Sequence, residues 1–352
     1  MEREGKAALS GAAVVAIYMA MVLLSGRVDV GQFGQLLFFY LTTASALWIL
    51  VAFFWVVGVL YKGRPVEGQG PGPFTVLASS FRKRWDYDRC VSAFWPPLLF
   101  ATLLTSFNAF KQMILPAAGF GYDPFLASVD RALFLGHDPW QLTHAVFSAP
   151  WMTVLIDLFY HGWFAPMSLG VIACAWLPAA SYRLRTQYCL SYLGVWIAIG
   201  SVLAFALPAA GPCFYPNFVG HSSFDGLVGE LLRVQQVTGN HLLALSNQAM
   251  LLKSASGNEL IIGGGISAMP SVHNALSVLF AIAAFRIRPI FGVILGVYAV
   301  LIWIGSIHLG WHYAIDGIAA ALLVIPIWSI AGRLADSFDR SAVERAAELQ
   351  PA

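Results

Sequence analysis

Two short stretches near the end of the chain place hydroxyl, imidazole and carboxylate groups in otherwise apolar sequence. The first is Pro-Ser-Val-His at residues 270–273, directly before an apolar segment. The second is GSIHLGWHYAIDG at residues 305–317, between two apolar segments. Ionisable side chains are costly in apolar surroundings, so both stretches are candidates for a functional site.

The second stretch offers a nucleophile together with a group that orients it. His312 and Asp316 are four residues apart and therefore share one face of a helix. A carboxylate at that spacing accepts a hydrogen bond from one imidazole nitrogen and leaves the other nitrogen with a free lone pair. His308 precedes His312 by four residues, so His308, His312 and Asp316 could instead ligate a zinc ion.

The first stretch offers what a phosphate group needs. The opening turn of a helix has unpaired N–H groups and a positive dipole end, and the Ser271 hydroxyl adds a donor. His273 in the same turn could protonate a leaving group. The pair would then work as one histidine that attacks phosphorus and one that protonates the departing oxygen. The structural alternative is that these histidines only brace neighbouring helices by hydrogen bonds.

Composition indicates which kind of fold positions these groups. Of the 352 residues, 59% are hydrophobic and 11% are charged, and the mean hydropathy is +0.71. Soluble domains carry about 25% charged residues, so we expect an integral membrane protein with an all-α, polytopic helix bundle. Runs of about 20 apolar residues can cross a bilayer. The predicted spans are residues 7–25, 33–61, 91–115, 151–177, 186–208, 270–287, 289–308 and 312–333.

The basic residues predict the orientation of this bundle. Eight spans put both termini on one side, and fifteen of the twenty Lys and Arg residues fall on that side. Positively charged connections stay in the cytoplasm. We therefore expect cytoplasmic termini and a site that faces the periplasm or exterior. The two long outer connections, residues 116–150 and 209–269, contain amphipathic pieces that predict short helices.

A second pair with four-residue spacing lies inside the predicted fourth span. Asp157 and His161 are compatible with a buried polar pair that ties helices together, and also with a proton relay or a role in binding a substrate headgroup. The sequence does not decide between these roles.

The two histidine motifs resemble the type-2 phosphatidic acid phosphatase superfamily, a group of membrane lipid phosphatases and phosphotransferases. Residues 270–273 align with its Pro-Ser-Gly-His motif, and residues 305–316 align with its Ser-Arg-x5-His-x3-Asp motif. The resemblance implies that His312 forms a phosphohistidine, that Asp316 orients it and that His273 is the general acid. It also implies a six-helix core over residues 91–333.

Three departures from the family pattern direct attention to one branch. Val272 replaces Gly, Ser306 stands in place of Arg, and the motif Lys-x6-Arg-Pro is absent. Pro-Ser-Val-His and a Gly-Pro element resemble the branch that contains inositol phosphorylceramide synthases. The missing basic residues need substitutes. The candidates are Lys111, Lys253 and Arg233, and Lys111 could alternatively extend to the membrane interface.

Together these features predict a membrane lipid phosphatase or phosphotransferase that acts on an amphiphilic phosphate ester at the outer leaflet. A phospho-headgroup transferase and a non-catalytic transporter or complex subunit remain alternatives. The expected partners are the bilayer and a membrane lipid phosphate, with no nucleic acid, cofactor or metal, and the expected location is a bacterial inner membrane. The expected substrate-binding residues are Ser271, Lys111, Ser306 and His308. The expected regions are residues 1–90 with two N-terminal spans, the catalytic core 91–333 and a cytoplasmic tail 334–352.

Overall fold

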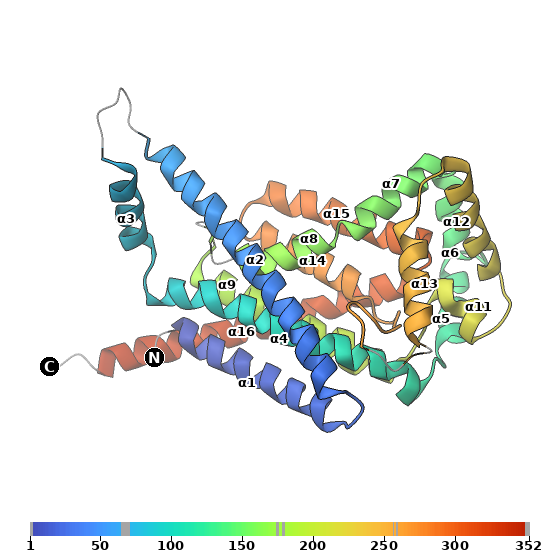
Figure 1. The fold of residues 1–352 in the computed structure, drawn as a ribbon, viewed down its shortest axis with the longest axis horizontal. Helices are drawn as coiled ribbons and strands as arrows, with labels where there is room; N and C mark the ends of the chain where they lie inside the picture. The colour runs from blue at the N-terminus through green and yellow to red at the C-terminus, as the bar shows by residue number, and fades with distance from the viewer. Residues whose placement is uncertain are drawn as a thin grey trace.

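The computed structural model of the protein describes residues 3–64, 71–173, 176–177, 180–255, 257 and 260–348. Within these ranges the chain forms helices joined by turns and loops, and no strand (Figure 1). This architecture confirms the all-α membrane bundle that the composition predicts.

Seven helical segments in the described ranges are long and apolar enough to cross a membrane. Two of them are interrupted, one by a turn at Gly162 and Trp163 and the other by a stretch of π-helix. The segments are α1 (Arg3–Leu24), α2 (Val30–Lys62), α4 (Tyr87–Ala118), α7 (Pro150–His161) with α8 (Phe164–Ala173), α9 (Tyr182–Gly194) with η1 (Val195–Leu203) and α10 (Ala204–Ala206), α15 (Pro289–His308) and α16 (Ala314–Glu348).

The predicted span at residues 270–287 is shorter than expected. Its helix, α14 (Val272–Phe285), has 14 residues and is therefore about 21 Å long, less than the hydrocarbon thickness of a bilayer. The helix starts at Ser271 because that side chain caps it by accepting a hydrogen bond from the Asn274 N–H. α14 packs against α15 and α16 within the bundle. The end of the predicted fourth span, at residues 174 and 175, lies outside the described residues.

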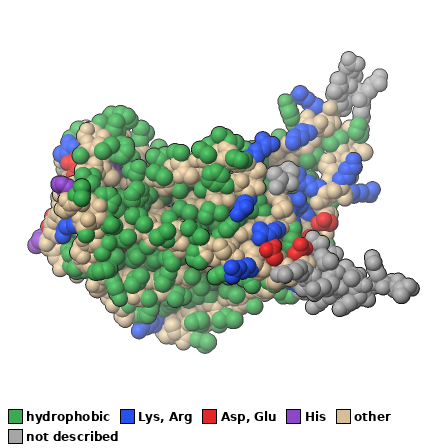
Figure 2. Space-filling model, turned by 180° about the vertical axis from the view of Figure 1, so that it is seen from behind, with side chains coloured by type: hydrophobic (Ala, Val, Ile, Leu, Met, Phe, Trp, Pro, Cys, Tyr) green, Lys and Arg blue, Asp and Glu red, His purple; other side chains and the backbone are tan. Residues whose placement is uncertain are grey.

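The two ends of the bundle differ in charge and structure. Both termini and α3 (Pro73–Arg84) lie at one end (Figure 1), and Lys and Arg side chains gather there (Figure 2). Short helices pack together at the opposite end, in the two long connections where the sequence predicts them. They are α5 (Asp123–Leu133), α6 (Pro139–Val146), η2 (Pro212–Phe214), α11 (Tyr215–Phe218), α12 (Phe224–Thr238) and α13 (Leu243–Ala255).

Three buried carboxylates hold this end of the bundle together. Asp130 of α5 accepts hydrogen bonds from two backbone N–H groups at the start of α16, at 2.6 and 2.9 Å. Asp123 of α5 accepts two from the loop before η2, both at 2.8 Å. Asp157 of α7 accepts two at the start of α13, at 2.6 and 2.9 Å. Each carboxylate thereby satisfies N–H groups that would otherwise be buried without partners.

Candidate active site

The turn between α15 and α16 carries the first candidate histidine. The backbone N–H groups of Trp311 and His312 both donate to the carbonyl of Ser306, at 2.9 and 3.2 Å. The turn passes through Gly310 at a φ of +76°, a conformation that side chains with a Cβ rarely adopt. The start of α16 is fixed by Asp130, so the position of His312 is set from both sides.

The His312 ring is oriented by a backbone carbonyl. Its Nδ1 lies 2.8 Å from the Ala268 carbonyl oxygen and 3.5 Å from Asp316 Oδ2. The nearer acceptor therefore takes the Nδ1–H, while the fully buried Asp316 carboxylate stands beside it and accepts from the Tyr313 N–H at 3.0 Å. This arrangement leaves His312 Nε2 with a lone pair. The spacing of His312 and Asp316 does bring the two side chains together, and Ala268 adds an acceptor that the sequence does not indicate.

His273 lies in an aromatic slot. Its ring is stacked on Trp163, with ring centroids 4.0 Å apart, and on Tyr160, with centroids 5.1 Å apart. Tyr160 lies in the last turn of α7, and Trp163 lies in the break between α7 and α8. The centroids of the His273 and His312 rings are 6.2 Å apart. The two histidines of separate sequence motifs are thus close neighbours, and both line the same space.

That space belongs to a cavity of about 580 Å³ inside the bundle. This volume is within the usual range of ligand sites, about 300–1,000 Å³. The polar side chains at the cavity include Lys111, His161, His273 and His312. Aromatic and aliphatic side chains of α2, α4, α8 and η1 form much of the remaining wall. The cavity therefore combines an apolar region with a small group of ionisable side chains.

Lys111 is the only one of the three substitute basic residues that lines the cavity. The segment before α14 packs closely on its backbone. An added Cβ at Gly265 would lie 2.7 Å from the Lys111 carbonyl carbon, which shows how near the loop approaches α4. Asn108 and Gln112 donate to the Ile261 carbonyl at 2.7 and 3.1 Å and hold the loop there. The glycines at residues 263–265 thus allow the loop to reach the site.

Neither of the other two basic candidates lines the cavity. Arg233 pairs with Glu230 on the same face of α12, and Lys253 lies near the end of α13. In the described part of the chain, no ion-pair partner is present for Lys111. The cavity therefore has a partly buried lysine side chain in its wall that can meet a substrate anion.

The pair in α7 also reaches the cavity. His161 Nδ1 lies 2.8 Å from the Asp157 backbone oxygen and 3.1 Å from its carboxylate, and the His161 ring lines the cavity. Because Asp157 also caps α13, it ties helices together and orients a cavity histidine at the same time. The sequence alone does not decide the role of this pair, but its four-residue spacing indicates that the two side chains meet.

Three further predicted residues do not reach the cavity. Ser271 is fully buried and accepts from the Asn274 side chain at 2.9 Å. Ser306 donates to the Trp303 carbonyl at 2.7 Å. His308 Nε2 bonds the Thr153 hydroxyl at 2.9 Å. All three hydroxyl and imidazole groups are engaged in contacts between neighbouring turns or helices.

His308 belongs to a separate contact, at the end of the bundle where the short helices pack. Its ring is stacked on His144 of α6, with ring centroids 3.8 Å apart. Burial lowers the pKa of His144, whose Nε2–H donates to the His308 carbonyl at 2.9 Å. His308 is thus turned away from His312. Among the described residues, no three His, Cys, Asp or Glu side chains are grouped to hold a metal ion.

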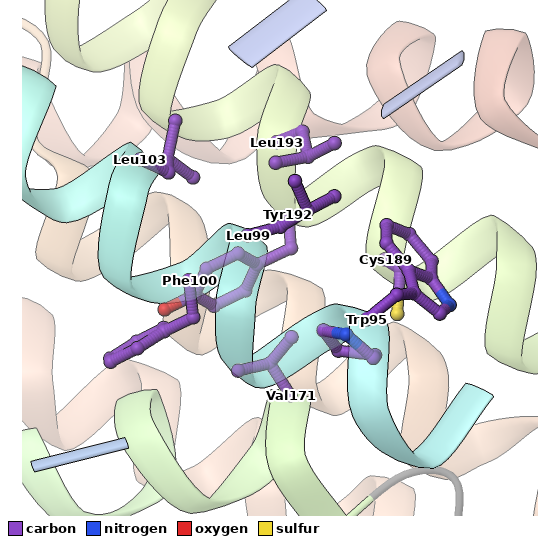
Figure 3. A pocket seen from close by; sticks show the side chains of 9 residues that line it. Trp95, Leu99, Phe100, Leu103, Val171, Cys189, Tyr192 and Leu193 are labelled. Atoms are coloured by element: carbon purple, nitrogen blue, oxygen red, sulfur yellow. The ribbon is translucent and has the colours of Figure 1, made fainter. Parts of the chain in front are cut away.

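A second, much smaller cavity of about 10 Å³ lies between α4, α8 and α9 (Figure 3). Trp95, Phe100, Val171 and Leu193 are among the side chains around it. A space of this size holds at most about one water molecule, and an apolar lining offers that water few partners. This cavity is a packing gap and contributes no chemistry.

One of the comparisons with known proteins finds a match. A family model described as the PAP2 superfamily matches residues 124–330, which contain both histidines and more than half of the chain. No curated protein matches the chain, and no solved structure matches it. The matched range lies within the core predicted at residues 91–333. The chain therefore belongs to the PAP2 superfamily, a membership that supports phosphatase-type activity.

Proposed function

We propose that the protein is a membrane lipid phosphatase or phosphotransferase that acts on an amphiphilic phosphate ester through a phosphohistidine at His312. The observation that carries the proposal is the placement of His273 and His312 at one cavity, with His312 Nδ1 held at 2.8 Å by the Ala268 carbonyl. This hydrogen bond leaves Nε2 as the nucleophilic atom.

In the first step, the lone pair of His312 Nε2 attacks phosphorus and the ester P–O bond breaks. His273 donates a proton to the departing oxygen, so that the lipid leaves as a neutral alcohol. Lys111 offsets the negative charge of the phosphoryl group. In the second step, an acceptor oxygen attacks phosphorus, the P–N bond breaks, and His273 takes the proton of the acceptor.

The nature of the acceptor separates two candidate functions. Water as the acceptor gives a phosphatase. A lipid or polyol hydroxyl as the acceptor gives a phosphotransferase, and with a phosphodiester donor, whose headgroup stays on phosphorus, the enzyme is a phospho-headgroup transferase. The Pro-Ser-Val-His sequence at residues 270–273 favours this second candidate, of the inositol phosphorylceramide synthase type. The gathering of Lys and Arg at the end that holds both termini supports cytoplasmic termini and a site on the periplasmic or outer side of a bacterial inner membrane.

The test uses the purified full chain and a phosphatidic acid labelled with ³²P in its phosphate. We expect His312→Ala to abolish phosphate release and His273→Ala to slow it by about 10²–10⁴-fold, the usual contribution of general acid catalysis. His221→Ala is the matched control, because His221 is exposed at the outer surface. Quenching of the wild type in alkaline detergent should trap ³²P on the protein that later acid treatment releases, and His312→Ala should trap none.

Full activity in either active-site variant contradicts the phosphohistidine mechanism. Transfer of label to a hydroxyl-bearing lipid instead of water identifies the transferase. Movement of the intact ester across a vesicle membrane without phosphate release would favour the transporter.

A further inference from the structure

We propose that the apolar part of the cavity is a binding site for the hydrocarbon chain of the substrate, and that α2 forms the wall that selects chain length. The inference rests on the proposed function, because it places the ester phosphate at His312. It adds a binding subsite from a helix that lies outside the family match at residues 124–330.

α2 contributes three lining residues to the cavity. Phe39, Tyr40 and Thr43 reach it from one face of the helix, and α2 packs on α4 and α8. The opposite face is open to the surroundings, since Phe38 is 70% exposed. α2 therefore stands as a partition between the cavity and the lipid that surrounds a membrane protein.

The cavity lining has polar and apolar members, as an amphiphilic ester has polar and apolar parts. Lys111, His273 and His312 line it where the phosphate is proposed to bind. Among the apolar members, α4 contributes Phe100, Leu104 and Phe107, and α8 contributes Met167 and Phe164, whose ring centroid lies 6.4 Å from that of His273. An ester with its phosphate between the histidines has to place its apolar part in the rest of the cavity. A hydrocarbon chain is the group that such a lining binds.

α2 is held in place against the site by the loop before α14. The Leu260 N–H donates to the Gln32 side chain at 2.8 Å, and the backbone of Gly263 hydrogen-bonds the Tyr40 hydroxyl. The same loop is fixed to α4 through Ile261. The face of α2 that lines the cavity is thus hydrogen-bonded to the loop beside Lys111. A larger side chain on this face of α2 therefore reduces the space inside the cavity.

The experiment compares two adjacent threonines of α2. Thr43 lines the cavity, whereas Thr42 is exposed and does not. We expect Thr43→Trp to lower kcat/KM for dipalmitoyl phosphatidic acid at least about tenfold, because even one methylene of pocket space is worth about tenfold or more. We expect dihexanoyl phosphatidic acid to be turned over as by the wild type. Thr42→Trp should leave both substrates unchanged, and thermal unfolding of both variants checks that they fold.

An unchanged ratio of the two substrates in Thr43→Trp, or an equal change in Thr42→Trp, overturns the inference while the proposed function stands. If the wild type neither releases phosphate from these esters nor transfers it to a hydroxyl-bearing lipid, the proposed function fails, and a binding measurement then tests the inference. A phosphatidic acid with a diazirine in its chain should label cavity-lining residues such as Phe39 and Met167, and Thr43→Trp should reduce that labelling. Labelling confined to the outward residues Phe38 and Thr42 overturns the proposal that the cavity binds the hydrocarbon chain.

Discussion

Gly265 provides a direct test of how closely the loop before α14 must approach α4. Its φ is +84°, and an added Cβ would lie 2.7 Å from the Lys111 carbonyl carbon and 2.8 Å from the Gln112 nitrogen. Both atoms belong to a helix backbone and cannot turn aside. Since ordinary contacts of a Cβ begin at 3.4 Å, Gly265→Ala has to push the loop away from α4 by about 0.7 Å, the difference from 2.7 Å.

Gly263 is the matched control within the same loop. Its φ is +69°, and no atom lies within 4 Å of an added Cβ. Both substitutions carry the cost of an alanine in a left-handed conformation, about 1–2 kcal/mol. Only Gly265→Ala adds the displacement, and a shift of about 1 Å at a reacting centre costs on the order of 10²-fold in rate. We therefore expect kcat to fall at least about tenfold in Gly265→Ala and to stay within about threefold of the wild type in Gly263→Ala.

The assay is phosphate release from a lipid phosphate in detergent micelles, measured below the unfolding temperature of both variants. Thermal unfolding of the same samples reports stability, and Gly265→Ala should be the less stable variant. Equal kcat and equal Tm in the two variants would refute the reasoning, because the close approach to Lys111 would then have no consequence for the site.

Four further outcomes follow from the geometry. Lys111→Met should raise KM for a lipid phosphate by about tenfold to a hundredfold, because a hydrogen bond to a charged group is worth about 1.5–3 kcal/mol. Lys111→Arg should recover part of this loss, and an unchanged KM in Lys111→Met contradicts a contact between Lys111 and the phosphate. EDTA should leave phosphate release unchanged, since transfer through histidine needs no metal ion, and a loss restored by zinc would contradict this. Burial raises the pKa of Asp130 to about 6, so the folded protein binds the carboxyl proton more tightly than the unfolded chain does. The wild type therefore loses stability as pH rises from about 4 to 6, and Asp130→Asn, which has no proton to lose there, does not. The Tm of Asp130→Asn minus that of the wild type should rise over this window, and a Tm difference that does not change with pH contradicts the prediction. Thr153→Val removes the hydrogen bond to His308 and should cost about 1 kcal/mol of stability without changing kcat, so a loss of kcat at full stability would place His308 in the chemistry.

The helices of the bundle were largely predictable, because a membrane crossing requires a long apolar run whatever its partners are. The four-residue spacing of His312 and Asp316 likewise predicted their proximity, since it depends only on helix geometry. Both ends of α14 were predictable to within two residues, since the predicted span at residues 270–287 compares with a helix at Val272–Phe285. The apolar residues before its cap at Ser271 lie in a loop that lines the cavity.

Other parts of the site depend on tertiary contacts that leave no mark in the sequence. The acceptor for His312 Nδ1 is a backbone carbonyl 44 residues away, and every residue type has such a carbonyl. Ser306 and His308 stand near His312 in the sequence, but the turn that follows them points their side chains to other neighbours. The cavity-lining face of α2 was equally hidden, because α2 is apolar on all sides and its periodicity does not reveal which face is covered.

The link between α2 and the loop before α14 also has a consequence for biosynthesis. The Leu260 N–H and the Gln32 side chain that it bonds are 228 residues apart in the chain. A ribosome makes α2 early and the loop late, so α2 waits in the bilayer until most of the protein has been synthesised. The cavity can then be closed only after the later segment has arrived. A nascent chain stalled before residue 260 should therefore have both N-terminal helices inserted and no enclosed site.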